Sequence, residues 1–316
     1  MGKHDFRFKT CIRFCLKDPF NLVYLPRFYL NTGFFMIHFE GELLEDQNAK
    51  LDLDNRSFNY GDGLFETIRV INGKIMFWED HYFRLMASMR ILRMEIPMNF
   101  SPEFLEEQIL QLIEANGLSQ KPVKVKINVY RKPGGLYRPT TREVGYAIRT
   151  YELENPFYIL NEEDYEVELF KDHYLTSGLL STLKSTNKTL NILASIFAEE
   201  NAYQNCLLVN ENKSIVEAIN GNLFVVKGNK IKTSPLSDGC LNGITRKQLI
   251  GIIQKTEEFT FEEASISPFE LQKADELFIT NVISGIQPIT KYRKKKFENK
   301  VAKQLLAKLN TTARLG

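Results

Sequence analysis

Cysteine and histidine are scarce in this chain of 316 residues, which contains four of each. The cysteines form no C-x-x-C pair and are too few for a disulfide framework, so a reducing, cytoplasmic setting is expected. The histidines are scattered and provide no cluster of metal ligands, so we expect no metal site. The four cysteines are Cys11, Cys15, Cys206 and Cys240.

Long apolar runs are missing as well. The most apolar stretch, residues 21–39, is broken by Pro26 and Arg27 and falls short of the roughly 18 uninterrupted apolar residues that a membrane helix needs. Neither sign of charge dominates, because 41 basic residues stand against 39 acidic ones. We therefore expect neither a membrane nor a nucleic acid as partner. The basic run at 291–296 is interpreted as a solvated loop, because the chain as a whole is nearly neutral.

The chain is long enough for two domains of ordinary size. From Met36 onward, strand-like and helix-like patterns alternate, which predicts a two-domain α+β (or α/β) architecture. Residues 36–152 are expected to form the smaller α/β domain and residues 165–316 the larger one. The polar, proline-containing segment 153–164 is the expected interdomain linker. Residues 1–35 show no clean period and are interpreted as an N-terminal extension outside the native domain.

Apolar periodicity and capping residues predict the main elements of both domains. Ser101 followed by Pro102, for example, is typical of a helix start, and the Asn72-Gly73 pair is typical of a hairpin turn. Helices are expected over residues 79–91, 101–115, 189–202, 245–255 and 297–309. Strands are expected over residues 37–39, 64–71, 74–78, 123–130, 144–151, 206–210 and 276–280, with a hairpin-rich region at 215–233.

Four separated segments carry the residue types that a catalytic site needs. They read NYGDGLFET at 59–67 with HYFRL at 81–85, LKSTN at 183–187, EAINGNLF at 217–224, and LNGITR at 241–246. In this order and spacing they resemble the class IV aminotransferases, which are fold-type IV pyridoxal-phosphate enzymes. The resemblance covers residues 36–289. It implies the fold of that family, an active site between the two domains, a homodimer, and pyridoxal 5'-phosphate as the cofactor.

The resemblance also implies roles for individual residues. Lys184 matches the lysine that forms the Schiff base with the cofactor, and its amine must be able to lose a proton. Glu217 matches the carboxylate that keeps the pyridine nitrogen protonated, so that the ring can accept electrons. The cofactor phosphate is assigned to Arg84 and to Ile244 and Thr245, because a guanidinium and a helix start both suit phosphate.

A fifth segment, FITNVISGIQP at 278–288, is similar to the last active-site loop of the family. Aminotransferases commonly have a hydroxyl residue at the position of Val282, where it contacts the phosphate. Here only the backbone N–H groups of Asn281 or Val282 remain for that contact. The phosphate site is therefore expected to be one hydroxyl short. Ile283, in the same loop, is expected to contact the substrate.

Details of these segments favour one branch of the family. Asn187 follows Lys184 by three residues and no tyrosine comes after it, unlike in branched-chain aminotransferases. Phe65 stands where D-amino-acid aminotransferases carry tyrosine. These features are similar to aminodeoxychorismate lyase, which would release 4-aminobenzoate and pyruvate in folate biosynthesis. The alternative is a branched-chain or D-amino-acid transaminase. Phe65 is also an expected substrate contact.

The loop after residue 130 provides the other expected substrate contacts. Gly134 and Gly135 followed by Tyr137 are closer to the lyase loop than to the Arg-x-His arrangement of D-amino-acid enzymes. Tyr137, Arg138 or both would hold a substrate carboxylate, because a guanidinium fork suits that group.

Overall fold

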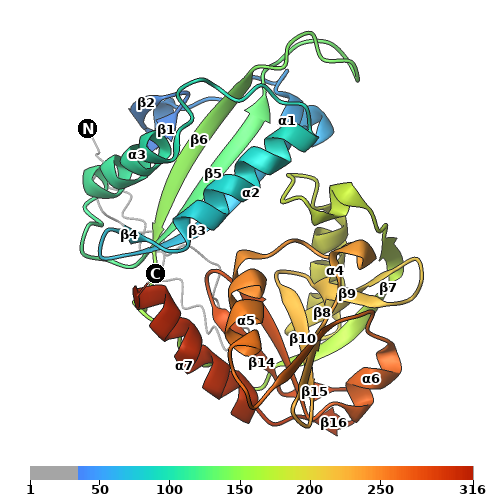
Figure 1. The fold of residues 1–316 in the computed structure, drawn as a ribbon. Coiled ribbons are helices and arrows are strands. Elements are labelled where there is room, and N and C mark those ends of the chain that lie inside the picture. The colour runs from blue at the N-terminus through green and yellow to red at the C-terminus, as the bar shows by residue number, and fades with distance from the viewer. Residues whose placement is uncertain (1–34, 316) are drawn as a thin grey trace, which may run out of the picture. The chain divides into compact units, whose positions relative to one another are not determined.

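The computed structural model describes residues 35–315, which contain three β-sheets with helices packed on them (Figure 1). The expected extension at residues 1–35, with Cys11 and Cys15, lies outside the described residues except for Phe35. Residues 153–165, between the first sheet and the other two, contain no helix or strand. The domain boundary placed at 153–164 stays a prediction.

The first sheet has six antiparallel strands in the order β2-β1-β6-β5-β3-β4. Alternate residues of β3 and β5 face two amphipathic helices, whose apolar side chains complete a single core. Ser101 caps the second of these helices by accepting a hydrogen bond from Phe104 N. The elements are β1 (Met36–Phe39), β2 (Glu42–Glu45), α1 (Arg56–Tyr60), β3 (Gly63–Ile71), β4 (Lys74–Ile75), α2 (Trp78–Ile91), α3 (Pro102–Ala115), β5 (Val123–Arg131) and β6 (Val144–Glu152).

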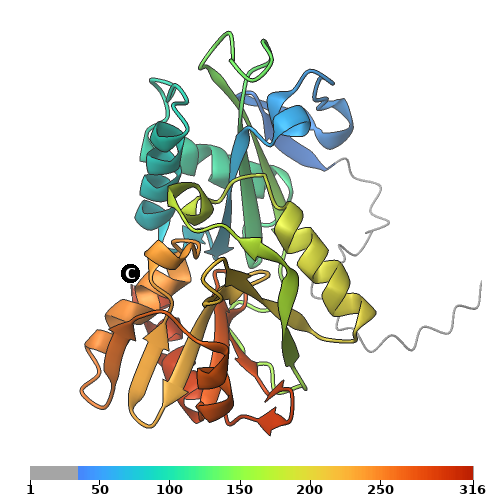
Figure 2. The same ribbon diagram turned by 90° about the vertical axis from the view of Figure 1, so that its right-hand side faces the viewer.

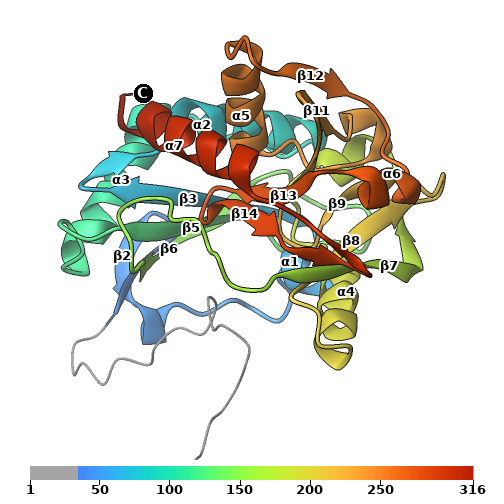
Figure 3. The ribbon, with the colours of Figure 1, turned by 90° about the horizontal axis from the view of Figure 1, so that it is seen from below.

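The C-terminal part contains two five-stranded sheets, in the orders β16-β15-β7-β8-β9 and β12-β11-β10-β13-β14. The helices α5 and α7 cover one face of the second of these sheets (Figure 3). The helix α4 packs with one side on β7 and β8 (Figure 2). The strands are β7 (Glu166–Leu175), β8 (Asn205–Asn210), β9 (Ile215–Ala218), β10 (Asn222–Lys227), β11 (Lys230–Thr233), β12 (Thr260–Glu263), β13 (Glu276–Asn281), β14 (Gly285–Ile289), β15 (Lys291–Tyr292) and β16 (Lys295–Lys296). The helices are α4 (Thr189–Glu200), α5 (Ile244–Gln254), α6 (Pro268–Lys273) and α7 (Lys300–Leu315).

Several expected boundaries were wrong. The strand expected at 74–78 ends at Ile75, because Phe77 takes a left-handed conformation with φ of 54° and starts α2 at Trp78. The last helix starts at Lys300 rather than 297 and extends to Leu315. The basic run at 291–296 is no loop but the short hairpin β15–β16, in which Lys291 pairs with Glu166. The strand β7 was not foreseen, because its charged sequence hides the alternation.

None of the described helices is long and apolar enough to cross a membrane. Within residues 35–315, no group of three or more histidine, cysteine, aspartate or glutamate side chains is arranged to hold a metal ion.

Candidate active site

The backbone around Lys184 is held by β3, a strand of the first sheet. Phe65 N donates a hydrogen bond to the Lys184 carbonyl at 2.9 Å, and Thr186 N donates to the Gly63 carbonyl at 2.9 Å. Leu64 and Ser185 form an antiparallel bridge between these two bonds. A strand that lies about 120 residues earlier in the chain therefore fixes the position of the lysine.

The Lys184 side chain lies beside an aromatic ring and near charged side chains of both signs. Its Nζ atom is 4.5 Å from the centre of the Phe65 ring. Burial lowers the pKa of Lys184 to about 8, and the positive charge of Arg84 acts in the same direction. A substantial fraction of the amine is therefore neutral near physiological pH, as a nucleophilic or proton-accepting lysine requires.

A buried carboxylate, Glu66, connects the site to α2. Its two oxygens accept hydrogen bonds from Arg84 Nε at 2.7 Å and Arg84 Nη2 at 2.6 Å, and His81 Nδ1 lies 2.8 Å away. Burial alone would raise the pKa of Glu66, but Arg84 and His81 outweigh it and hold that pKa well below its usual range. The third Arg84 nitrogen, Nη1, donates to the Asn242 carbonyl at 2.9 Å. Glu66 therefore aims the Arg84 guanidinium at the turn before α5.

Glu66 had no assigned role in the sequence analysis, although a signal for it exists. It alternates with the apolar residues Leu64, Ile68 and Val70 on the buried face of a strand. A carboxylate in such a position needs a cationic partner. His81 and Arg84 stand three residues apart on one helix face, as that partnership requires.

Glu217 is buried on β9, and its carboxylate is fixed by the same turn. Its Oε2 atom accepts a hydrogen bond from Leu241 N at 2.8 Å. Burial raises the pKa of Glu217, while the Leu241 N–H and the charges of Lys188 and Lys184 oppose that rise. The carboxylate thus faces the two lysines and can accept a further N–H donor, which fits the protonated nitrogen of a pyridine ring.

The turn at residues 241–243 leads directly into α5. Asn222 Nδ2 donates to the Leu241 carbonyl at 2.9 Å, and a side chain at Gly243 would place its Cβ 2.1 Å from Asn222 Oδ1. The first N–H groups of α5 receive no side-chain cap. The Thr245 hydroxyl is buried and has no hydrogen-bond partner among the described residues. A phosphate group could accept hydrogen bonds from the uncapped N–H groups of α5 and from the Thr245 hydroxyl. The nearby Arg84 guanidinium would balance its negative charge.

The loop between β13 and β14 has its conformation fixed by side chains. Asn281 Oδ1 accepts hydrogen bonds from the N–H groups of Ile283 at 3.0 Å and Ser284 at 2.9 Å. The Val282 carbonyl accepts from the Tyr158 hydroxyl at 3.0 Å, and the Ile283 carbonyl accepts from Arg69 Nη1 at 2.6 Å. The Asn281 side-chain oxygen is therefore used within the turn.

Within one chain, only some of the predicted substrate residues lie near Lys184. Phe65 lies beside Lys184, and Ile283 is half-buried in the β13–β14 loop. Tyr137 is 90% exposed on the β5–β6 loop, with its ring 5.9 Å from that of Tyr60, and Arg138 is also exposed. The base of that loop is nevertheless ordered, because Arg56 Nη1 donates to three consecutive backbone carbonyls, those of residues 134, 135 and 136.

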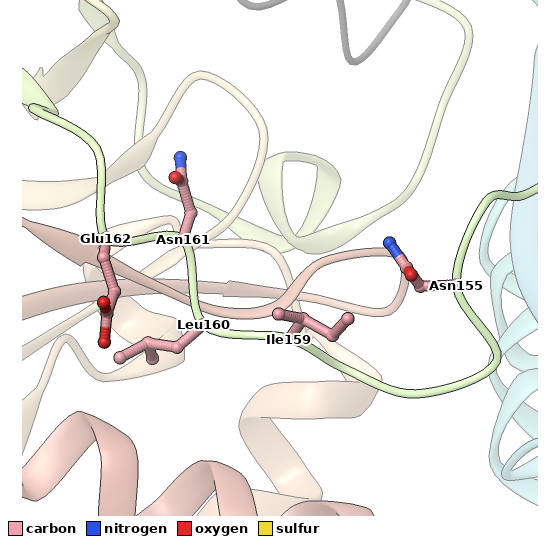
Figure 4. Close-up of a pocket in the computed structure, with 5 residues that line it drawn as sticks. All are labelled: Asn155, Ile159, Leu160, Asn161 and Glu162. Atoms are coloured by element: carbon pink, nitrogen blue, oxygen red, sulfur yellow. The ribbon is translucent and has the colours of Figure 1, made fainter.

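A separate open pocket lies along the segment that joins the first sheet to the others (Figure 4). None of the predicted site residues lines it. Its polar groups are two amides and one carboxylate, and none of these can form a covalent bond to a carbonyl cofactor. It therefore does not compete with the Lys184 region as the active site. The lining residues are Asn155, Ile159, Leu160, Asn161 and Glu162.

The chain is similar in sequence to known proteins of one family. The family model described as amino-transferase class IV matches residues 63–292. A D-alanine aminotransferase of Bacillus licheniformis is 27% identical over 263 residues, which cover 80% of this chain and 86% of the relative.

Solved structures show the same fold. The branched-chain aminotransferase of Thermoproteus uzoniensis, determined with norvaline, has a TM-score of 0.78 and 26% identity, and the match covers 88% of this chain and 94% of that one. A Legionella pneumophila protein provisionally assigned as a 4-amino-4-deoxychorismate lyase has a TM-score of 0.73 and 26% identity. The match covers 84% of this chain and 97% of that one. These similarities confirm the fold class that the sequence predicted.

Proposed function

Because the chain belongs to the class IV aminotransferase family of pyridoxal-phosphate enzymes, we propose that it is a 4-amino-4-deoxychorismate lyase. The observation that carries this proposal is the Phe65 ring, 4.5 Å from the Lys184 amine. A flat apolar face beside the reactive lysine suits a cyclic substrate that becomes aromatic. The similarity to the Legionella pneumophila protein supports the same reaction. The products would be 4-aminobenzoate and pyruvate.

The residues described above would hold the cofactor as follows. Lys184 would bind it covalently through Nζ, and Glu217 would hold its pyridine nitrogen. Arg84 and the start of α5, with Ile244 and Thr245, would hold its phosphate, together with the backbone N–H groups of Asn281 and Val282. When bound, pyridoxal phosphate supplies an electron sink next to the substrate nitrogen.

In the proposed reaction, Lys184 acts as the base. Its neutral Nζ accepts the proton from the ring carbon that carries the substrate nitrogen. The bond between the ring and the enolpyruvyl oxygen then breaks, and the oxygen leaves with the electron pair as an enolate. The methylene carbon of this enolate takes up the proton that Lys184 Nζ holds, which gives pyruvate and restores the neutral amine. The ring becomes aromatic, so the atoms balance without a second substrate. The Glu217 carboxylate would keep the pyridine nitrogen of the cofactor protonated throughout the reaction.

A homodimer is the assembly that we propose for this enzyme. The outer face of α4 exposes Ile192, Leu193 and Ile196, and Leu179 and Leu180 before it are exposed as well. Such a patch is typical of a protein–protein interface. In a dimer, the exposed β5–β6 loop would close the pocket of the second copy.

The dimer predicts a simple result in solution. The wild-type protein should elute with twice the mass of the chain in size-exclusion chromatography with light scattering. Ile196→Lys should shift it toward the monomer, because a charge would enter the apolar patch. The matched change Phe269→Lys lies at an exposed position of α6, outside the patch, and should leave the mass unchanged. A wild-type monomer would contradict the assembly.

A second function is favoured by the curated relatives. The Bacillus licheniformis protein is a D-alanine aminotransferase, and the Thermoproteus uzoniensis structure is a branched-chain aminotransferase. The same side chains serve that reaction, in which Lys184 would move a proton from the Cα atom of an amino acid. The amino group would then pass to a 2-oxo acid in a second half-reaction.

One assay separates the two functions. The purified enzyme is supplied with 4-amino-4-deoxychorismate generated in situ, and 4-aminobenzoate and pyruvate are measured beside a Lys184→Ala control. Rapid, lysine-dependent release of both products supports the lyase. No release by cofactor-loaded enzyme refutes the lyase and leaves the transaminase, which a panel of D- and L-amino acids with 2-oxo acids would then identify.

Arg84→Ala is expected to weaken both cofactor binding and folding. It removes a cation from the phosphate site and leaves Glu66 buried with only His81, which costs about 3 kcal/mol of unfolding free energy. Urea unfolding and titration of the apoenzyme with pyridoxal phosphate would measure the two effects. Arg90→Ala, at an exposed position of the same helix, is the control. Unchanged cofactor affinity in Arg84→Ala would contradict the phosphate assignment.

The rate at which the apoenzyme takes up pyridoxal phosphate should rise with pH through a midpoint near 8. The cause is the lowered pKa of Lys184, about 8, because only the neutral amine attacks the cofactor aldehyde. Stopped-flow absorbance between pH 6 and 11 would follow the reaction. A midpoint near 10.5, the ordinary lysine value, would show that the pKa is not lowered.

A further inference from the structure

A second orphaned hydroxyl lies near the phosphate site. Thr280 on β13 is 2% exposed, and its Oγ1 atom has no hydrogen-bond partner within residues 35–315. A buried hydroxyl without a partner is unfavourable, and native proteins contain few of them. Such an atom in an otherwise well-paired sheet indicates a partner that the chain itself does not supply.

The strand register shows which way this hydroxyl faces. Thr280 lies directly opposite Asn222 in the antiparallel β10–β13 pair, and opposite residues share one face of a sheet. The Asn222 amide bonds to the Leu241 carbonyl and packs against Gly243. Thr280 therefore points to the side of the sheet where the turn at 241–243 begins α5.

The next residue pair on the same face confirms the direction. Phe224 and Phe278 are stacked with ring centres 5.2 Å apart, and they belong to one core cluster with Leu249 and Ile253 of α5. The Asn222–Thr280 pair lies two residues further along each strand, toward the start of α5.

Thr245 approaches the same region from the helix. It precedes Leu249 by four residues, so both side chains lie on the face of α5 that contacts the sheet. The two orphaned hydroxyls, Thr245 on α5 and Thr280 on β13, are thus brought to the first turn of α5 from opposite sides.

We propose that the Thr280 hydroxyl donates a hydrogen bond to the cofactor phosphate. It would supply a hydroxyl where the phosphate site lacks one at Val282, because Thr280 lies near the end of β13, two residues before Val282 in the turn that follows. The proposal rests on the phosphate position assigned above, at the start of α5. It also accounts for a buried hydroxyl that would otherwise only destabilise the sheet.

The test uses Thr280→Val, which keeps the side-chain shape and removes the hydroxyl. Its apoenzyme should melt at the same temperature as wild type or higher, because an unpaired buried hydroxyl is lost. Its affinity for pyridoxamine 5'-phosphate, which cannot bond covalently to Lys184, should fall about tenfold, the usual worth of a hydrogen bond to a charged group. Thr280→Ser should restore most of the affinity.

Thr233→Val is the matched control in the same sheet. The Thr233 hydroxyl is also buried, but it donates to the Leu223 carbonyl at 2.7 Å. This control should show the opposite pattern, with a melting temperature lower by about 3 °C and unchanged affinity. Pyridoxamine without phosphate should bind equally to wild type and Thr280→Val.

The outcomes separate this proposal from the phosphate assignment. If Thr245→Val weakens pyridoxamine 5'-phosphate binding while Thr280→Val keeps it within twofold, the phosphate lies at α5 and the role of Thr280 is wrong. If neither variant weakens binding, both the phosphate position and the role of Thr280 are refuted. Equal losses of pyridoxamine and pyridoxamine 5'-phosphate in Thr280→Val would also refute a phosphate contact.

Discussion

Lys184→Ala is expected to abolish turnover and covalent attachment of the cofactor. Beside Phe65, Lys184 combines an amine with a pKa lowered to about 8 and a backbone that β3 holds through the hydrogen bonds of Phe65 N and Thr186 N. The alanine variant should fold, because the truncated side chain leaves the hydrogen bonds of its own backbone intact. The absorption band of the lysine-bound cofactor should disappear.

Borohydride reduction followed by peptide mass spectrometry provides the decisive readout. In the wild type, the peptide containing residue 184 should gain the mass of the reduced cofactor, and in Lys184→Ala no peptide should gain it. Lys188→Ala is the control, since Lys188 is a second half-buried lysine that faces Glu217. It should retain the modification at Lys184. A modified peptide that contains Lys188 instead would show that the lysine was assigned wrongly.

Glu217→Gln should keep the cofactor bound but reduce kcat about a hundredfold, the scale on which an electrostatic partner in an active site acts. The glutamine oxygen can still accept the hydrogen bond from Leu241 N, so the local structure should persist. The negative charge that keeps the pyridine nitrogen protonated is lost, and electron withdrawal weakens. Steady-state kinetics with cofactor-saturated enzyme would measure the effect.

Glu276→Gln is a matched control for that change. Glu276 is also buried, and its carboxylate accepts hydrogen bonds from the N–H groups of Val301 and Ala302 at the start of α7. This variant should lose stability without a comparable loss of kcat. Equal kcat values for Glu217→Gln and wild type would refute the pyridine-nitrogen role.

The sequence predicted most helices, because their apolar faces recur with the helical period and because Ser101 and Gly243 mark helix starts. It did not predict β7, since that strand pairs in parallel with neighbours that are distant in the chain and carries charged residues. Local patterns do not record such pairings. The end of β4 depended on the left-handed conformation of Phe77, which an aromatic residue rarely adopts.

The candidate site was predicted unevenly for a similar reason. Lys184 and Glu217 stand in recognisable local motifs, so the sequence could propose them as candidates, and their roles stay predictions. Arg69 and Tyr158 act through hydrogen bonds to the carbonyls of the β13–β14 loop, about 125 to 215 residues away in sequence. Their partners are backbone atoms, which every residue has, so no residue pattern could reveal these contacts.

The way β3 holds the Lys184 backbone has a consequence for the order of events during synthesis. The strand emerges from the ribosome long before the lysine, whereas α5 and the β13–β14 loop emerge well after it. A nascent chain that ends before residue 285 would have its lysine placed but no complete phosphate site. With the phosphate site that we propose, we expect capture of the cofactor to be a late step of folding, so that free cofactor would stabilise only chains that already contain the β13–β14 loop.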